Sequence, residues 1–372
     1  WRKMSKIVIS GYYGFCNAGD EAMLSAMIGA FWDLEPGIRI TVISGNPKDT
    51  AERHGVQAVH RFDLAGIARA LRDADMLISG GGSLLQDVTS DRSLYYYLSI
   101  MWLAKKLGTP VMLYGQGIGP VGGSLARRVT RRICRQADLI TVRDEGSKKE
   151  LLELGVTRPE ITVTADPVLG MHPVSPHAGR LVLRRYGMEG AKLLIGVAVR
   201  QWKNLSQYKR QMAEAADELI RRYQARIVFL PMQIPDDVMV SRSILQQMKE
   251  QKSAAILSER FSTTEFLSIV GNLDLLIGIR LHALIFGAVM QVPVIGLSYD
   301  PKIERFLASI GEQPVTDLES VTAQSVLEKV ASFWPEEGER VNPQLAYTSR
   351  LREQAFYNAE LALALLERKK RR

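Results

Sequence analysis

The residues best suited to catalysis are Arg280 and His282, which follow the strand-like run Leu273–Gly278. Being two positions apart, they are expected on one side of an extended chain, just where a helix begins. A histidine exchanges protons near neutral pH, and a neighbouring arginine can bind an anion. Lys302 follows the next strand-like run and adds another cation. These residues predict a site that binds an anionic ligand and transfers a proton.

Arg143 directly follows another strand-like run, Leu139–Val142. The adjacent Asp144 is compatible with a purely structural ion pair, which is common for such arginines. If Arg143 instead faces the same ligand, the chain supplies two guanidinium groups and an ammonium group. This set suits a small ligand that carries both a phosphate and a carboxylate.

Three glycine-rich segments follow further strands and can offer backbone N–H groups to a ligand: Gly11–Ala22, Gly80–Ser83 and Gly115–Pro120. In the first segment, Asp20 and Glu21 occur where a helix starts, so capping and an acceptor-binding or base role are both open. The last segment fails as a dinucleotide fingerprint because Pro120 follows its final glycine. A nicotinamide cofactor is therefore not expected.

The elements that position these residues alternate between short β-branched runs and helix-length segments, as in βαβ units of parallel sheets. The expected strands are Lys6–Ser10, Arg39–Ile43, Met76–Ser79, Val111–Tyr114, Leu139–Val142 and Ile161–Thr164, then Leu193–Val199, Ile227–Leu230, Ala255–Leu257, Leu273–Gly278 and Pro293–Leu297. Prolines and a glycine interrupt the alternation at His172–Gly179. The pattern predicts an α/β protein with two Rossmann-like doubly wound domains, 1–172 and 173–342, facing a central cleft. A helix and a basic tail, 343–372, follow.

The composition is that of a globular protein: 372 residues, 46% hydrophobic and 24% charged, with two cysteines. So few cysteines suit a reducing cytosol. Polar residues and a proline interrupt the longest apolar run, 281–297, and no secretory leader is expected. The net charge of +8 favours an anionic partner, but no nucleic-acid motif is present, so nucleic acid is not expected.

A basic helix is expected over residues 124–135, with Leu125, Val129 and Ile133 as its apolar stripe. Charged faces of this kind are often simply solvated. A functional interpretation is contact with anionic lipid or with a diphosphate group. The arginines concerned are Arg127, Arg128, Arg131, Arg132 and Arg135.

The motifs, taken in order, resemble those of the polysaccharide pyruvyl transferases, most closely the CsaB type of bacterial secondary cell wall polymers. They are Gly11–Gly14 with Asn17–Ala22, Gly80–Ser83, Gly115–Pro120, Arg143-Asp144 with Ser147, Ala165–Pro167, Arg280–His282 and Tyr299–Lys302. The resemblance implies a fold like the GT-B glycosyltransferases and phosphoenolpyruvate as donor. It also implies a pyruvate ketal across the 4- and 6-hydroxyls of a sugar, β-N-acetylmannosamine in a lipid-diphosphate-linked disaccharide.

The resemblance further implies residue roles. Arg143, Arg280 and His282 are expected to be catalytic, and they bind phosphoenolpyruvate together with Lys302 and Ser147. The expected acceptor-binding residues are Gly14, Asn17, Asp20, Glu21, Gly82 and Gln116. Phosphoenolpyruvate is a co-substrate, so no cofactor is expected, and the absence of a carboxylate cluster predicts no metal. The expected location is cytoplasmic, peripheral at the inner face of the cell membrane.

Ketal formation requires a proton at the methylene carbon of the enol, and His282 is the predicted acid. Two alternatives remain open. A nucleotide-sugar glycosyltransferase of the same fold commonly grips the ribose with a glutamate, yet Ala283–Gln291 contains no carboxylate. A non-catalytic anion-binding protein would also explain the positive charge.

Overall fold

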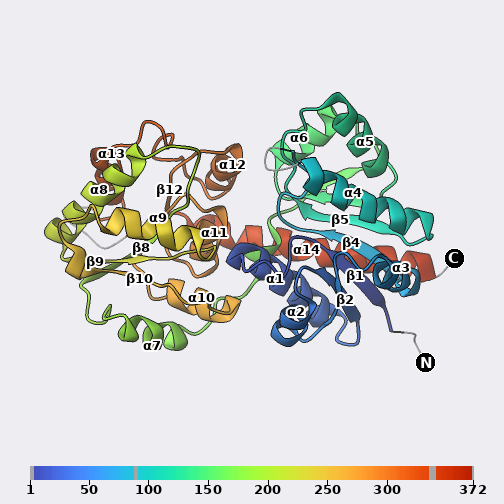
Figure 1. Ribbon diagram of the computed structural model, residues 1–372, viewed down its shortest axis with the longest axis horizontal. Coiled ribbons are helices and arrows are strands. Elements are labelled where there is room, and N and C mark those ends of the chain that lie inside the picture. Colours follow the sequence, from blue (N-terminus) through green and yellow to red (C-terminus); the bar gives the residue numbers. More distant parts are fainter. Residues whose placement is uncertain (1–3, 88–90, 335–340, 371–372) are drawn as a thin grey trace. The chain divides into compact units, whose positions relative to one another are not determined.

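The computed structural model describes residues 4–87, 91–334 and 341–370. It divides into two compact units (Figure 1). Unit 1 comprises residues 1–171 and 350–372, and unit 2 comprises residues 172–349. Each unit is a parallel sheet whose strands are connected through helices. The predicted fold class, α/β with doubly wound Rossmann-like domains, is confirmed.

The sheet of unit 1 has the strand order β3-β2-β1-β4-β5-β6-β7. Its strands are β1 (Lys6–Ser10), β2 (Arg39–Ser44), β3 (Gln57–His60), β4 (Met76–Gly80), β5 (Val111–Gln116), β6 (Leu139–Val142) and β7 (Ile161–Val163). All of β4 and β5 is buried, as expected for central strands covered on both faces. The strand order reverses beside β1, and ligands bind at the carboxyl ends of strands near such a reversal.

The helices of unit 1 follow its strands, and several of them begin at a side-chain cap. They are α1 (Ala18–Leu34), α2 (Pro47–His54), α3 (Leu64–Asp73), α4 (Asp91–Lys106), α5 (Ser124–Cys134), α6 (Glu145–Glu153) and the 3₁₀ helix η1 (Pro167–Gly170). The side chains of Asn17, Asn46, Asp63 and Asp144 accept hydrogen bonds from backbone N–H groups of the first turns. These caps fix where the chain turns from strand to helix.

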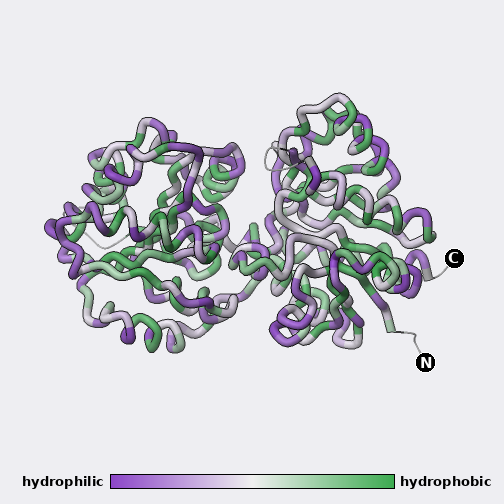
Figure 2. The backbone as a smooth tube through the Cα atoms, viewed as in Figure 1, coloured by the Kyte–Doolittle hydropathy of each residue, from purple (hydrophilic) through white to green (hydrophobic). Residues whose placement is uncertain are grey.

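Unit 2 has a smaller parallel sheet with the order β10-β9-β8-β11-β12. Its strands are β8 (Leu193–Ala198), β9 (Ala225–Phe229), β10 (Ala254–Ile256), β11 (Leu275–Gly278) and β12 (Val294–Gly296). Its helices are α7 (His177–Arg185), α8 (Gln207–Tyr223), α9 (Asp236–Leu245), η2 (Gln251–Ser253), α10 (Thr263–Val270), α11 (Leu281–Val289), α12 (Pro301–Ser309) and α13 (Ala323–Ala331). Figure 2 shows hydrophobic residues concentrated along the strands of each unit.

The last helix, α14 (Leu345–Lys370), contributes to both units. Residues 345–349 belong to unit 2, and residues 350–370 belong to unit 1. Within unit 1, the buried Asn358 Oδ1 accepts hydrogen bonds from Thr141 Oγ1 at 2.5 Å and Thr164 Oγ1 at 2.9 Å. Its Nδ2 donates to the carbonyl of Ala165 at 3.4 Å. The helix is thereby fixed to the carboxyl ends of β6 and β7. The last two residues of the predicted basic tail lie outside the described residues.

Candidate active site

Two arginines of unit 2 follow adjacent strands at matching positions. Ala198 of β8 is paired with Gly278 of β11, and Arg200 and Arg280 each follow two residues later. Because parallel strands end at the same edge of the sheet, both arginines reach the edge where ligands bind in such folds. Arg200 is half-buried, and the Arg280 side chain is only 11% exposed.

The Arg280 guanidinium is held by a buried carboxylate. Its Nη2 donates to Asp237 Oδ1, and the side chain of Asp237 is 1% exposed. Asp237 Oδ2 accepts hydrogen bonds from the backbone N–H groups of Met232 and Gln233, both at 3.0 Å. Arg280 Nε is buried and has no hydrogen-bond partner in the described residues. Because a buried donor without an acceptor is costly, this side of Arg280 is suited to an incoming anion.

Arg200 is fixed by aromatic residues. Its Nη1 donates to the Tyr299 hydroxyl at 3.0 Å, and its backbone carbonyl accepts from the Tyr208 hydroxyl at 2.5 Å. The rings of Trp202 and Tyr299 lie 4.4 Å apart, and the Arg200 guanidinium is 5.5 Å from the Tyr299 ring. These contacts hold the cation in place at the sheet edge.

Lys302 lies on the first turn of α12. Its Nζ is 3.1 Å from Asp300 Oδ2 and 5.7 Å from the centre of the Tyr299 ring. Tyr299 therefore contacts both Arg200 and Lys302. The structure brings three cations of unit 2 to one edge of the sheet, where the sequence predicted two.

Asp237, Arg200 and Arg280 all influence the pKa of Tyr208. Burial raises the pKa of Tyr208 most, Asp237 raises it further, and Arg200 and Arg280 lower it. The net shift is upward, so the hydroxyl stays protonated at neutral pH and remains a donor to Arg200.

His282 occupies the first turn of α11 and is half-buried. Strand β11 ends at Gly278 and the helix begins at Leu281, so the expectation that an extended chain carries both Arg280 and His282 is wrong. Arg280 alone has an extended backbone, as the residue before the helix. Arg280 and His282 are both at the start of α11. The first backbone N–H groups of a helix favour a bound anion.

Arg143 lies in unit 1, where its guanidinium contacts three side chains. The side chain is 6% exposed, with Nη1 at 3.1 Å from Asp166 Oδ2 and Nη2 donating to Ser83 Oγ at 3.1 Å. Nε lies 3.6 Å from Asp144 Oδ2. A Cβ atom at Gly117 would come within 2.6 Å of the guanidinium carbon, so a larger residue there would displace the guanidinium. Arg143 thus joins the loops after β4, β5, β6 and β7.

Several other predicted site residues make local structural contacts. Ser147 Oγ accepts a hydrogen bond from the Ile118 N–H at 3.0 Å and is buried. Glu21 Oε1 accepts from the Gly14 N–H at 2.9 Å, and its Oε2 lies 2.8 Å from His54 Nε2. As described above, Asn17 caps α1. These contacts shape the loops, and the predicted ligand contacts of the same residues stay predictions.

Asp20, Gly82 and Gln116 come together at the carboxyl ends of β1, β4 and β5. Gln116 Nε2 donates to the Gly82 carbonyl at 3.3 Å, and a Cβ atom at Gly82 would lie 3.6 Å from Asp20 Oδ1. Gly82 has a φ of 74°, which favours glycine. Gln116 Oε1 is buried and accepts no hydrogen bond from the residues described. This group offers polar contacts suited to hydroxyls.

All five predicted arginines are exposed, four on helix α5 and Arg135 directly after it. Its buried residues are Ala126, Thr130, Ile133 and Cys134. Leu125 is 60% exposed, so the predicted apolar stripe is wrong at that position. Ala126, one residue after Leu125, is buried in its place, whereas Ile133 of the predicted stripe is buried as expected. Arg127 donates to the carbonyls of Val121 at 3.1 Å and Glu153 at 3.2 Å.

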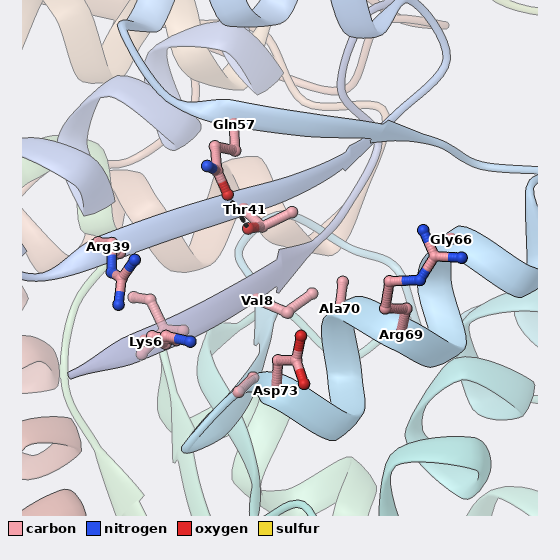
Figure 3. Close-up of a pocket in the computed structure, with 11 residues that line it drawn as sticks. Lys6, Val8, Arg39, Thr41, Gln57, Gly66, Arg69, Ala70 and Asp73 are labelled. Atoms are coloured by element: carbon pink, nitrogen blue, oxygen red, sulfur yellow. Dashed lines mark hydrogen bonds between the residues drawn. The ribbon is translucent and has the colours of Figure 1, made fainter.

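A pocket of 240 Å³ lies elsewhere in unit 1, beside helix α3 (Figure 3). Lys6, Arg39 and Gln57, the first residues of β1, β2 and β3, line it together with Arg69 and Asp73. The pocket is therefore at the amino-terminal ends of these strands, opposite the edge that carries the predicted loops. It contains none of the predicted site residues.

The sequence matches the family described as "Polysaccharide pyruvyl transferase" over residues 17–301. The chain belongs to this family. It is therefore a transferase, and the matched segment includes Arg143, Arg280 and His282, whereas Lys302 lies just beyond it. No curated protein is significantly similar to the chain in sequence.

Solved structures share the fold of this pyruvyl transferase family member at low sequence identity. MnaA of S. aureus with UDP is 11% identical with a TM-score of 0.67, covering 97% of this chain and 95% of that one. The UDP-GlcNAc 2-epimerase of Methanocaldococcus jannaschii is 16% identical with a TM-score of 0.63, covering 95% and 100%. HepE of Anabaena, in complex with UDP and glucose, is 14% identical with a TM-score of 0.61, covering 97% and 99%. These similarities show a GT-B-like fold.

Two further observations concern metals and membranes. Across the described ranges, no group of three or more His, Cys, Asp or Glu side chains is arranged to hold a metal ion. None of the helices in these ranges is both long and apolar enough to cross a bilayer.

Sequence reasoning assigned no role to Arg200, Asp237 or Tyr208. The signal for Arg200 was present, because it directly follows the predicted strand Leu193–Val199, as Arg143 follows its own strand. Asp237 has no comparable signal, since it lies in the first turn of α9 and meets Arg280 only through the fold.

Proposed function

We propose that the protein transfers pyruvate from phosphoenolpyruvate to a sugar of a lipid-linked cell wall glycan precursor, forming a 4,6-ketal and releasing phosphate. Family membership supports pyruvyl transfer to a polysaccharide. The observation that carries the choice of donor is the pair Arg200 and Arg280 at matching positions on adjacent strands, with Lys302 nearby. Three cations match a small ligand bearing a phosphate and a carboxylate.

In this proposal Arg280 and Arg200 bind the two anionic groups of the donor. The Nε of Arg280 supplies a donor without another acceptor in the described residues, and Asp237 fixes the group's orientation. Lys302 balances the charge on the departing phosphate. The N–H groups that begin α11 add to the positive potential at this edge.

The reaction begins with a proton from the His282 imidazolium to the methylene carbon of phosphoenolpyruvate. A sugar hydroxyl then attacks the cationic C2, losing its proton, and a C2–O bond forms. The bond between C2 and the phosphate oxygen breaks, and the second hydroxyl closes the ring at C2. One hydroxyl proton restores His282, and the other leaves with the phosphate. General acid catalysis of this kind contributes about 10²–10⁴-fold.

The acceptor is assigned to the carboxyl edge of the unit 1 sheet, at Asp20, Gly82 and Gln116. We propose Asp20 as the base for the hydroxyl, because its Oδ1 would lie 3.6 Å from a Cβ atom at Gly82 and so belongs to the same group of polar atoms. The contacts of Arg143 favour positioning of these loops over direct binding of phosphoenolpyruvate, which stays a prediction for Arg143 and Ser147.

We assign the protein to the inner face of the cell membrane, with a peripheral association through the exposed arginines of α5. Arg128 and Arg132 on this helix and Arg135 directly after it are exposed and suit anionic headgroups or the acceptor diphosphate. The CsaB-type acceptor, with β-N-acetylmannosamine as the ketal-bearing sugar, belongs to the same proposal.

The test is phosphate release from phosphoenolpyruvate with a synthetic lipid-diphosphate N-acetylmannosaminyl-N-acetylglucosamine acceptor, following product mass with and without EDTA. We expect acceptor-dependent release and a product heavier by one pyruvate ketal, unaffected by EDTA. Calorimetry with phosphoenolpyruvate alone gives an independent measure of donor binding. Absence of that binding would refute the assignment of the donor.

The competing function is a glycosyltransferase or epimerase that takes a nucleotide sugar, because the structural relatives named above include complexes with UDP. Helix α11 of this chain contains no carboxylate to bind a ribose. Calorimetry with UDP separates the two functions. We expect no UDP binding under conditions in which phosphoenolpyruvate binds.

A further inference from the structure

An aromatic cluster surrounds Arg61 in unit 1, a residue to which no role has been assigned above. The guanidinium carbon of Arg61 lies 4.5 Å from the centre of the Tyr96 ring, 5.0 Å from Phe62 and 5.2 Å from Phe15. Phe15 is in turn stacked on Tyr12, with ring centres 4.3 Å apart. Cations prefer such positions over aromatic faces.

These ring contacts do not occupy the N–H hydrogen-bond donors of Arg61. Aromatic rings interact with the faces of a guanidinium, whereas its N–H groups point outward in the plane of the group. Arg61 Nε is buried and has no hydrogen-bond partner among the residues that the structure describes. An arginine held in this way is oriented in advance for an anionic group.

The cluster also has an exposed apolar surface. Phe62 is 71% exposed although its ring contacts Arg61. An aromatic ring held in place with its surface open to solvent can pack against the apolar face of a sugar ring.

The cluster lies at the edge of the sheet that carries the proposed acceptor residues. Tyr12 and Phe15 follow β1, Arg61 and Phe62 follow β3, and the Arg61 N–H donates to the carbonyl at the end of β2 at 2.9 Å. Burial raises the pKa of Tyr12, as does Asp20, whereas Arg61 lowers it. Asp20 and Arg61 therefore act on the same ring.

We propose that Arg61 and Phe62, supported by Phe15 and Tyr96, form a subsite for an anionic portion of the glycan acceptor. Phe62 packs against a sugar ring, and Arg61 binds a neighbouring negatively charged group such as a phosphate. The inference rests on the proposed function, because it names where the acceptor of that reaction binds. It assigns the charged end of the acceptor to unit 1.

The test is equilibrium binding, which requires no turnover and no phosphoenolpyruvate. Two probes are compared: N-acetylmannosaminyl-N-acetylglucosamine with a 1-diphosphate, and the same disaccharide as a neutral methyl glycoside. We expect Arg61→Gln to weaken binding of the diphosphate about tenfold and to leave the neutral probe nearly unchanged. We expect Phe62→Ala to weaken binding of both probes several-fold.

Leu64→Ala is the matched control, because Leu64 is 67% exposed and lies two residues beyond Phe62. We expect it to bind both probes as the wild type does. Equal losses from Phe62→Ala and Leu64→Ala would overturn the sugar subsite in favour of a general apolar surface. Unchanged diphosphate binding by Arg61→Gln, or no binding of either probe by the wild type, would also overturn it. A wild type that binds the diphosphate probe but not phosphoenolpyruvate would refute the proposed donor and leave the subsite intact.

Discussion

Arg200 and Arg280 follow adjacent strands at matching positions. Each lies two residues beyond one of the paired residues Ala198 and Gly278. Their surroundings differ. Arg280 is bound by the buried Asp237, whereas Arg200 is held by the Tyr299 hydroxyl. Because their partners differ, we expect different effects on donor binding from substitutions at the two positions.

Arg200→Ala is expected to weaken phosphoenolpyruvate binding roughly 10- to 100-fold, since hydrogen bonds to charged groups contribute about 1.5–3 kcal/mol. Arg200→Lys keeps the charge but loses the planar donor arrangement, so it should recover only part of the loss. Calorimetry with phosphoenolpyruvate measures both. Arg222→Ala, an exposed arginine of α8 in the same unit, is the control and should bind normally.

Asp237→Asn tests whether Arg280 needs its carboxylate partner. Asparagine can still accept from the backbone N–H groups of Met232 and Gln233, so the loop should persist while the charge pairing is lost. We expect the KM for phosphoenolpyruvate to rise about tenfold with a smaller change in kcat, because Asp237 orients Arg280. Steady-state kinetics and a thermal melt distinguish this from unfolding. A change in kcat alone would contradict the positioning role.

His282→Gln is expected to reduce turnover by about 10²–10⁴-fold while phosphoenolpyruvate still binds. Glutamine keeps a polar side chain on α11 but cannot deliver the proton. Single-turnover phosphate release gives the rate, and calorimetry gives the affinity. Turnover near the wild-type level would exclude His282 as the acid.

Membrane association is predicted to depend on α5. Each cation near an anionic surface contributes about 1 kcal/mol, so replacing Arg128, Arg132 and Arg135 by serine should weaken vesicle binding roughly 100-fold at low salt. Sedimentation with vesicles rich in anionic lipid measures the effect. The control makes the same charge change on α8, at Arg210, Arg221 and Arg222. Equal losses in both variants would show that net charge alone is responsible.

Asp138 is expected to make stability depend on pH. Burial acts to raise its pKa, but hydrogen bonds from Lys105, the Val111 N–H and Lys369 outweigh it, so the pKa is lowered. The ionised form therefore stabilises the fold above the pKa of the unfolded chain, and this contribution is lost as pH falls through the folded pKa. Asp138→Asn should lower the melting temperature at pH 7, and the difference from wild type should vanish at pH values well below about 4. Glu153→Gln, in an exposed pair with Lys149, should change little at either pH.

The sequence predicted the strands that have apolar runs and missed the one that does not. Strand β3 reads Gln-Ala-Val-His and lies at the sheet edge, where only pairing with β2 defines it. Arg280 and His282 were found because strand ends mark the ligand edge of such sheets. Asp237, the partner of Arg280, was not found, because it is far from Arg280 in sequence and contacts it only through tertiary packing. For the same reason Arg61 was not found, since its aromatic partners come from three separate segments.

Helix α14 has a consequence for how the chain is made. Asn358 completes the hydrogen bonding of Thr141 and Thr164 at the ends of β6 and β7, yet the ribosome adds it only after the whole of unit 2. During synthesis, nearly all of unit 2 is available to fold while unit 1 still lacks its last helix. The half of the molecule that is translated first is therefore the half that is finished last.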